Sequence, residues 1–265
     1  MAKRVFSAIL LIVIFVPLLW IGGTAFKIFM SILAIMGLYE LIHIKETKKK
    51  LPLFVKCCAY LVVLFFTFNA ANVIDFQYTL DYRLMSVIIF SFLSPLVFIN
   101  NSEKYSINDG LYLISAVLFI GLSFNLLIVT RNYDLSYIIY LFLITTITDT
   151  FALFTGRLIG KHHFTTISPK KTVEGLIGGT LMGTFVSVCY YHTVINSVKS
   201  LVFLIIITAG LSLVGQLGDL VFSAIKRYYN KKDFSDLIPG HGGILDRFDS
   251  MIFVVLAFII VLGII

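Results

Sequence analysis

Three aspartates near the carboxyl end of the chain have the side chains and the spacing of a divalent-metal site. Asp219 lies near the end of one apolar segment, and Asp246 and Asp249 lie at the start of the next. A helical hairpin would bring these carboxylates to one face of a membrane. Asp246 and Asp249 share a helix face at i and i+3, as do Asp219 and Ser223 at i and i+4. Magnesium takes such hard oxygen ligands together with phosphate oxygens.

Basic side chains accompany these carboxylates in the long polar interval from Gln216 to Ser250. They are Lys226, Arg227, Lys231, Lys232 and Arg247. Such cations could hold the remaining negative charge of a polyphosphate. A Pro-Gly-His-Gly-Gly turn precedes Asp246. Gly242 and Gly243 in this turn would let backbone amides approach a phosphate closely, and His241 is either a phosphate donor or a turn residue.

A second polar segment lies upstream, around Asp149. A carboxylate inside a membrane span is costly enough to indicate a functional site, and the alternative is a structural hydrogen bond to a threonine or to a facing helix. Arg157 places a cation at the end of the same span. Further on, Lys170 and Lys171 lie beside a helix start that Thr172 can cap. That arrangement can cradle a phosphate, or the lysines simply keep the loop in the cytosol.

The rest of the chain consists of apolar runs. Of its 265 residues, 59% are hydrophobic and only 13% are charged, against roughly a quarter charged in soluble proteins. The runs are continuous, whereas a membrane barrel would show alternating segments of ~10 residues. We therefore predict an all-α fold, a polytopic transmembrane helical bundle forming one integral membrane domain over residues 1–265. Within it, residues 1–135 would hold helices with fewer motifs, and 136–265 the catalytic helices and cytosolic loops.

About nine spans of roughly 20 apolar residues are predicted. They fall near Val5–Ile21, Ala25–Ile44, Leu53–Val73, Leu84–Ile99, Leu111–Val129, Leu135–Phe154, Val173–Ile195, Ser200–Phe222 and Ser250–Ile265. With the N-terminus in the cytosol, only Lys27, Arg83, Arg131 and Lys199 of the 21 basic residues would lie outside. Because Lys and Arg in short loops stay cytosolic, both motif-rich loops are expected to face the cytosol.

The polar and small residues inside these spans have simpler expected roles. Ser212, Gly215, Gln216 and Asp219 form a stripe on one helix face, which should face the bundle or a water-filled cleft. The repeated glycines between residues 175 and 183 would let helices pack closely. Glu40, late in the second span, could extend or cap toward the lysines that follow it, and its role stays open at this point.

The run from Ser223 to Asp249 resembles the signature of the phosphatidate cytidylyltransferase family, also called CDP-diacylglycerol synthases. The positions that match are Ser223, Lys226, Arg227, Lys232, Asp233, Pro239, His241, Gly242, Gly243, Asp246, Arg247 and Asp249. ISPKKTVEG and the segment that begins at Asp149 also resemble the family, although Phe151 and Leu153 stand where its members often have Gly and Tyr. The resemblance covers the C-terminal half by motif and the whole chain by architecture.

The resemblance implies a magnesium-dependent transfer of the cytidylyl group of CTP to phosphatidate, with pyrophosphate released, in a plasma or inner membrane. The metal ligands would be Asp219, Asp246, Asp249 and Asp149, with room for a second cation. The other catalytic residues would be Lys226, Arg227, His241 and Arg247. The substrate-binding residues would be Arg157, Lys170, Lys171, Ser223, Gly242 and Gly243. CTP, phosphatidate and membrane lipids would be the partners. Nucleic acid is excluded as a partner because no basic soluble domain is present, and the small-residue helix faces are compatible with a homodimer.

Two other functions remain open at this point. A CTP-dependent kinase of a polyprenol or phytol would share the metal site and the basic loops, but it would release CDP instead of pyrophosphate. A transporter could use Asp149 and Asp219 as an ion path. Against a transporter, the polar residues gather at the cytosolic end of the spans instead of the bilayer midplane, and the chain shows no inverted repeat.

Overall fold

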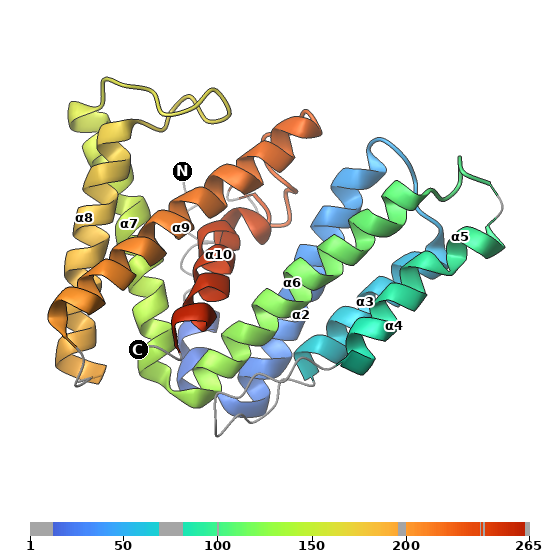
Figure 1. Ribbon diagram of the computed structural model, residues 1–265, viewed down its shortest axis with the longest axis horizontal. Coiled ribbons are helices and arrows are strands. Elements are labelled where there is room, and N and C mark those ends of the chain that lie inside the picture. The colour runs from blue at the N-terminus through green and yellow to red at the C-terminus, as the bar shows by residue number, and fades with distance from the viewer. Residues whose placement is uncertain are drawn as a thin grey trace. The chain divides into compact units, whose positions relative to one another are not determined.

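The computed structural model describes residues 13–68, 82–99, 101–195, 200–238, 240 and 242–262. Over these ranges the chain forms helices, with two isolated β-bridges and no strand (Figure 1). The helices are α2 (Gly23–Glu46), α3 (Leu53–Phe68), α4 (Tyr82–Leu93), α5 (Pro95–Phe98), α6 (Ile107–Tyr133), α7 (Leu135–Ile159), α8 (Val173–Tyr190), the π-helix η1 (Tyr191–Ile195), α9 (Leu201–Tyr228) and α10 (Leu245–Leu262). The predicted all-α class is confirmed.

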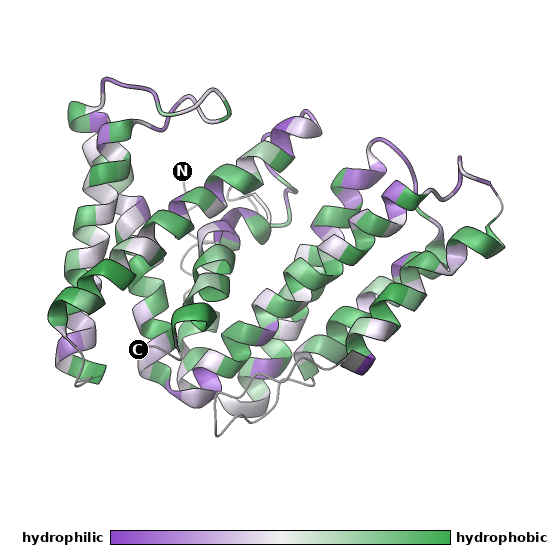
Figure 2. Ribbon diagram, in the orientation of Figure 1, coloured by the Kyte–Doolittle hydropathy of each residue, from purple (hydrophilic) through white to green (hydrophobic). Residues whose placement is uncertain are grey.

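Five of the described helices are long and apolar enough to cross a membrane: α2, α6, α7, α8 continued by η1, and α9. Figure 2 shows hydrophobic residues along most of these helices. The expected span near Leu84–Ile99 is interrupted at Ser94, because Pro95 begins a separate short helix. The count of nine spans, the cytosolic N-terminus and the single domain over residues 1–265 stay predictions.

The chain forms two compact units. The first comprises Met1–Tyr133 and Asp233–Leu245, and the second comprises Asp134–Lys232 and Asp246–Ile265. In the first unit, α2, α3 and α6 pack side by side, and α4 lies on α6 (Figure 1). Bulky apolar side chains such as Phe26 and Phe124 are fully buried between these helices.

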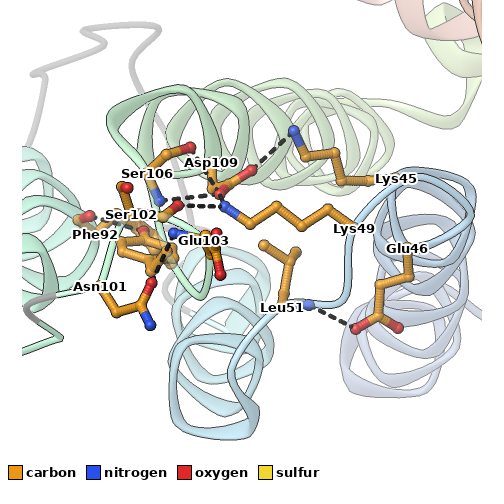
Figure 3. A network of polar contacts seen from close by, with 11 residues as sticks. Lys45, Glu46, Lys49, Leu51, Phe92, Asn101, Ser102, Glu103, Ser106 and Asp109 are labelled. Atoms are coloured by element: carbon orange, nitrogen blue, oxygen red, sulfur yellow. Dashed lines mark hydrogen bonds and ion pairs between the residues drawn. The ribbon is translucent and has the colours of Figure 1, made fainter.

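A polar network fastens the start of α6 within the first unit (Figure 3). Asp109, in the first turn of α6, accepts hydrogen bonds from the backbone nitrogen and the hydroxyl of Ser106 at 3.0 and 2.8 Å. The ammonium groups of Lys45 and Lys49 lie 2.9 and 2.5 Å from its two carboxylate oxygens. Asp109 therefore caps its own helix and ties it to the end of α2.

In the second unit, α7 and α8 pack closely along a line of glycines. A Cβ added at Gly179 would collide with the backbone oxygen of Thr148 at 2.6 Å, and one at Gly183 would collide with the Thr148 hydroxyl. The predicted packing role of these glycines is confirmed. Thr172 caps α8 as expected, because its hydroxyl accepts a hydrogen bond from the Gly175 nitrogen at 3.1 Å.

Candidate functional site

The polar stripe of α9 faces other helices of the second unit, as expected from the sequence. The buried hydroxyl of Ser212 is hydrogen-bonded to that of Thr148 in α7 at 2.8 Å. One turn further on, the amide of Gln216 donates to the hydroxyl of Thr180 in α8 at 2.9 Å. Asp219 extends this face of the helix toward its C-terminal end.

Asp219 is paired with a lysine from the loop that connects α7 to α8. The ammonium group of Lys171 lies 2.5 Å from one carboxylate oxygen of Asp219, and it also donates to the backbone oxygen of Gln216 at 3.4 Å. The Ser223 hydroxyl donates to the other carboxylate oxygen at 3.4 Å. The side chains of Lys171 and Asp219 are 28% and 29% exposed. Both therefore remain open to a ligand.

The same loop is held at its base by Glu174, in the first turn of α8. This carboxylate accepts hydrogen bonds from the backbone nitrogens of Lys161 and His162, and it lies 2.6 Å from His162 Nδ1. Lys170 and Arg157 are exposed at the ends of the loop region. Of the three predicted substrate-binding cations of this region, Lys171 contacts α9, whereas Lys170 and Arg157 are exposed.

A second ion pair joins α9 to α10. Lys226, two turns after Asp219 on the same face, places its ammonium group 2.6 Å from a carboxylate oxygen of Asp246. The two side chains are only 10% and 6% exposed. Arg227 and Arg247, the next residues along each helix, are exposed instead. The Arg227 guanidinium donates to the backbone oxygen of Lys231 at 2.9 Å.

Three carboxylates of the second unit lie near enough to interact electrostatically. Asp249 in α10 interacts with Asp219 in α9 and with Asp149 in α7. Asp249 also accepts a hydrogen bond from the Ser250 nitrogen at 2.8 Å. The buried Ser250 hydroxyl lies beside the Asp149 carboxylate. Negative charge thus gathers where α7, α9 and α10 meet.

These donors suit a hard cation such as magnesium, but they do not form a complete cage. Within the described part of the chain, no three His, Cys, Asp or Glu side chains converge closely enough to hold a metal ion. Lysine ammonium groups occupy one oxygen each of Asp219 and Asp246. Magnesium is usually bound by one or two carboxylates together with substrate phosphates and water. The donor set therefore fits a metal that arrives with a phosphate ligand, and the metal assignment stays a prediction.

The segment Asp233–Leu245, which we call the signature loop, belongs to the first unit. Gly240 and Gly242 have φ angles of 80° and 82°, which favour glycine. The Ile238 nitrogen donates to the Gly242 oxygen at 2.9 Å, so the loop closes on itself. Pro239 and His241 lie outside the described residues, so the predicted role of His241 stays a prediction.

Glu40 is a functional candidate that the sequence interpretation assigned incorrectly. Its side chain is fully buried, so the expectation that it extends toward the lysines after α2 is wrong. Its carboxylate instead accepts hydrogen bonds from the Ser235 hydroxyl and from the nitrogens of Ile244 and Leu245, at 2.6, 2.8 and 2.9 Å. The available signal was a glutamate within an apolar span, since such a residue indicates a function by default.

Comparisons with known proteins cover nearly the whole chain. The model of the cytidylyltransferase family matches residues 2–265. A phosphatidate cytidylyltransferase of Staphylococcus haemolyticus is 35% identical over 255 residues, which is 96% of each chain. Proteins of the same name from Staphylococcus saprophyticus and Staphylococcus aureus are each 36% identical over 256 residues, again 96% of each chain. The matched range therefore spans α2 as well as the motif-rich half.

Proposed function

The chain belongs to the cytidylyltransferase family, and on that premise we propose that it transfers the cytidylyl group of CTP to phosphatidate. The products are CDP-diacylglycerol and pyrophosphate, and the reaction serves phospholipid biosynthesis. The observation that carries this proposal is the 35–36% identity to phosphatidate cytidylyltransferases over 96% of both chains. The apolar helices agree with it, because an integral membrane protein can take a lipid substrate directly from the bilayer.

The reaction needs positioning and charge neutralisation more than proton transfer. A phosphate oxygen of phosphatidate attacks the α-phosphorus of CTP, so one P–O bond forms. The bond from that phosphorus to the oxygen bridging the α and β phosphates breaks, and pyrophosphate leaves with the electron pair. No general base is required, because the attacking oxygen is already anionic. Catalysis then depends on holding two anionic reactants together.

The paired lysines supply that neutralisation. In the structure, Lys171 and Lys226 are paired with Asp219 and Asp246. We expect both ammonium groups to turn from these carboxylates to phosphate oxygens when substrate binds, because phosphate carries more charge. Arg227 follows Lys226 at the C-terminal end of α9, Arg247 follows Asp246 at the start of α10, and both side chains are exposed. Their planar guanidinium groups suit the bidentate binding of phosphate.

Magnesium dependence is part of the proposal. The candidates to hold the metal are Asp219, Asp249 and Asp149, whose carboxylates interact with one another, and Asp246, which lies one helical turn before Asp249 in α10. A bound magnesium ion would neutralise the triphosphate and favour departure of pyrophosphate. The repulsion between Asp249 and its two acidic neighbours supports this assignment, since a cation would relieve it.

The orientation of the site is also proposed. Most basic residues of the connecting loops, including Lys170 and Lys171, fall on one side of the membrane in the predicted topology. The positive-inside tendency favours the cytosol for that side, where CTP is made. Labelling of Lys170→Cys and of a cysteine at Asn132 with a membrane-impermeant maleimide, in intact cells, tests the orientation. Modification of Lys170→Cys from outside the cell would contradict a cytosolic site.

The function is tested with purified protein, radiolabelled CTP, phosphatidate and magnesium. We expect pyrophosphate release and a labelled liponucleotide in equal amounts, and loss of both in Asp219→Ala and Asp246→Ala variants that remain monodisperse in detergent. In a parallel reaction with a polyprenol or phytol in place of phosphatidate, formation of CDP and a phosphorylated lipid alcohol would instead identify a CTP-dependent kinase. Ion flux in proteoliposomes without nucleotide turnover would identify a transporter.

A further inference from the structure

Glu40 connects α2 to the signature loop within the first unit. It is 0% exposed, although it lies in the second-last turn of a helix that can span a membrane. Its oxygen Oε1 accepts from the Ser235 hydroxyl and the Ile244 nitrogen, and Oε2 accepts from the Leu245 nitrogen. A buried carboxylate is costly unless hydrogen-bonded, and here the three donors come from both ends of one loop.

The two backbone donors are the groups that a helix start leaves unsatisfied. Leu245 is the first residue of α10, and Ile244 precedes it. The first N–H groups of a helix have no partner within the helix, and a negative charge there is favourable. A residue just before the helix usually supplies this cap. Here the cap comes from a residue more than two hundred positions earlier in the chain.

Ser235 and Gly243 show how closely the loop fits the Glu40 carboxylate. The Ser235 hydroxyl that donates to Glu40 also accepts from the Leu237 nitrogen at 3.3 Å, so Glu40 orders the first turn of the loop as well. A Cβ added at Gly243 would overlap the Glu40 carboxylate. The absence of a side chain at Gly243 is therefore explained by the space that Glu40 occupies.

We propose that Glu40 is a positioning residue that clasps the two ends of the signature loop and fixes the start of α10. The residue that follows Leu245 is Asp246, one of the site carboxylates. A shift in the backbone at the start of α10 would therefore also displace the Asp246 carboxylate. Glu40 acts through the loop and does not touch substrate. The expected effect of Glu40 on turnover rests on the proposed function, whereas its expected effect on the order of the signature loop does not.

The central variant is Glu40→Gln, which keeps the shape of the side chain. Its NH₂ group would meet the Leu245 N–H or one of the Oε1 donors, so at least one hydrogen bond is lost together with the charge. Glu46→Gln is the matched control: Glu46 lies on the same helix and accepts from Lys56 Nζ and the Leu51 nitrogen, away from the loop. Glu40→Asp keeps the charge on a shorter side chain and should recover part of the loss.

Two readouts separate positioning from general stability. In hydrogen–deuterium exchange of the detergent-solubilised protein, we expect the amides of Ile244 and Leu245 to exchange about tenfold faster in Glu40→Gln than in the wild type or Glu46→Gln. In turnover of CTP with phosphatidate, we expect kcat to fall about 10–100-fold, the range typical of residues that orient a site. The KM for CTP should change little, and Glu40→Asp should recover part of kcat. Gly243→Ala should reproduce the kcat loss with Glu40 in place.

Unchanged exchange of these amides in Glu40→Gln would overturn the proposal, whatever the activity of the protein. Faster exchange with wild-type kcat would overturn the positioning role and leave only a structural contact. If the wild type itself made no liponucleotide, the proposed function would fail, but the exchange experiment would still decide whether Glu40 orders the loop. A Glu40→Gln variant that melts like Glu46→Gln yet loses kcat would support positioning.

Discussion

The buried ion pair between Lys226 and Asp246 allows a quantitative test of how α9 and α10 are joined. Replacing Lys226 by Met removes the ammonium group and keeps most of the side-chain volume. Asp246, which is 6% exposed, would then lose the ammonium group that lies 2.6 Å from it. Replacing Asp246 by Leu instead leaves the buried Lys226 ammonium group without this carboxylate.

The expected magnitude follows from the distance and the burial. Two unit charges 2.6 Å apart attract by roughly 6 kcal/mol at an effective dielectric constant of about 20, before the cost of desolvation is subtracted. Breaking a buried pair by removing one partner typically destabilises a protein by about 3–5 kcal/mol. At about 2–4 °C per kcal/mol for a protein of this size class, each single variant should melt on the order of 10 °C lower.

The assay is thermal unfolding of the purified variants in one detergent, followed by loss of monodisperse protein. The double variant Lys226→Met/Asp246→Leu should melt above at least one single variant, because both charges of the pair are removed together. Arg227→Met is the control: its exposed side chain predicts a change within about 0.5 kcal/mol. Strictly additive losses in the double variant, or an Arg227→Met loss equal to that of Lys226→Met, would refute the reasoning.

Three further predictions concern other parts of the second unit. Lys171→Met should lower the melting temperature little, because a partly exposed ion pair contributes about 0–1 kcal/mol. The same variant should lower kcat/KM for CTP at least tenfold. A melting temperature that falls as strongly as the turnover would contradict a phosphate-binding role. Gly183→Ala should destabilise the protein by about 1–3 kcal/mol through its collision with Thr148, whereas Gly210→Ala, which meets no atom within 4 Å, should be neutral or stabilising by up to about 1 kcal/mol in the same unfolding assay. Chelation should abolish pyrophosphate release until magnesium is restored, and Asp219→Asn should raise the magnesium concentration needed for half-maximal rate; turnover that persists in a chelator would exclude the metal proposal.

The helical class and the orientation of the polar stripe could be predicted from hydropathy and spacing. Ser212 and Gln216 recur every three to four residues, so a helix must present them on one face, and that face cannot be exposed to lipid without cost. The close packing of α7 and α8 followed from the glycine spacing in the same way. These features depend on residues near one another in the chain, where the geometry of a helix is known in advance.

The pairing of charges could not be predicted in the same way. The sequence indicated lysines for phosphate and aspartates for metal, but the partners Lys171 and Asp219 are set by how α7, α8 and α9 pack. The distances within the site depend on that packing and have no counterpart in residue spacing. Glu40 is the clearest case, because its donors lie in a distant segment and the lysines nearby in sequence offered a simpler but incorrect partner.

The contact between Glu40 and the Ile244 nitrogen spans 204 residues of chain, which has a consequence for biosynthesis. A membrane protein is made and inserted from its N-terminus, so α2 is synthesised long before the backbone groups that satisfy its glutamate exist. Until translation is nearly complete, a charged group in an apolar helix is without these donors. Chains that stop short of residue 244 would therefore keep an acidic group in α2 without the backbone donors of Ile244 and Leu245.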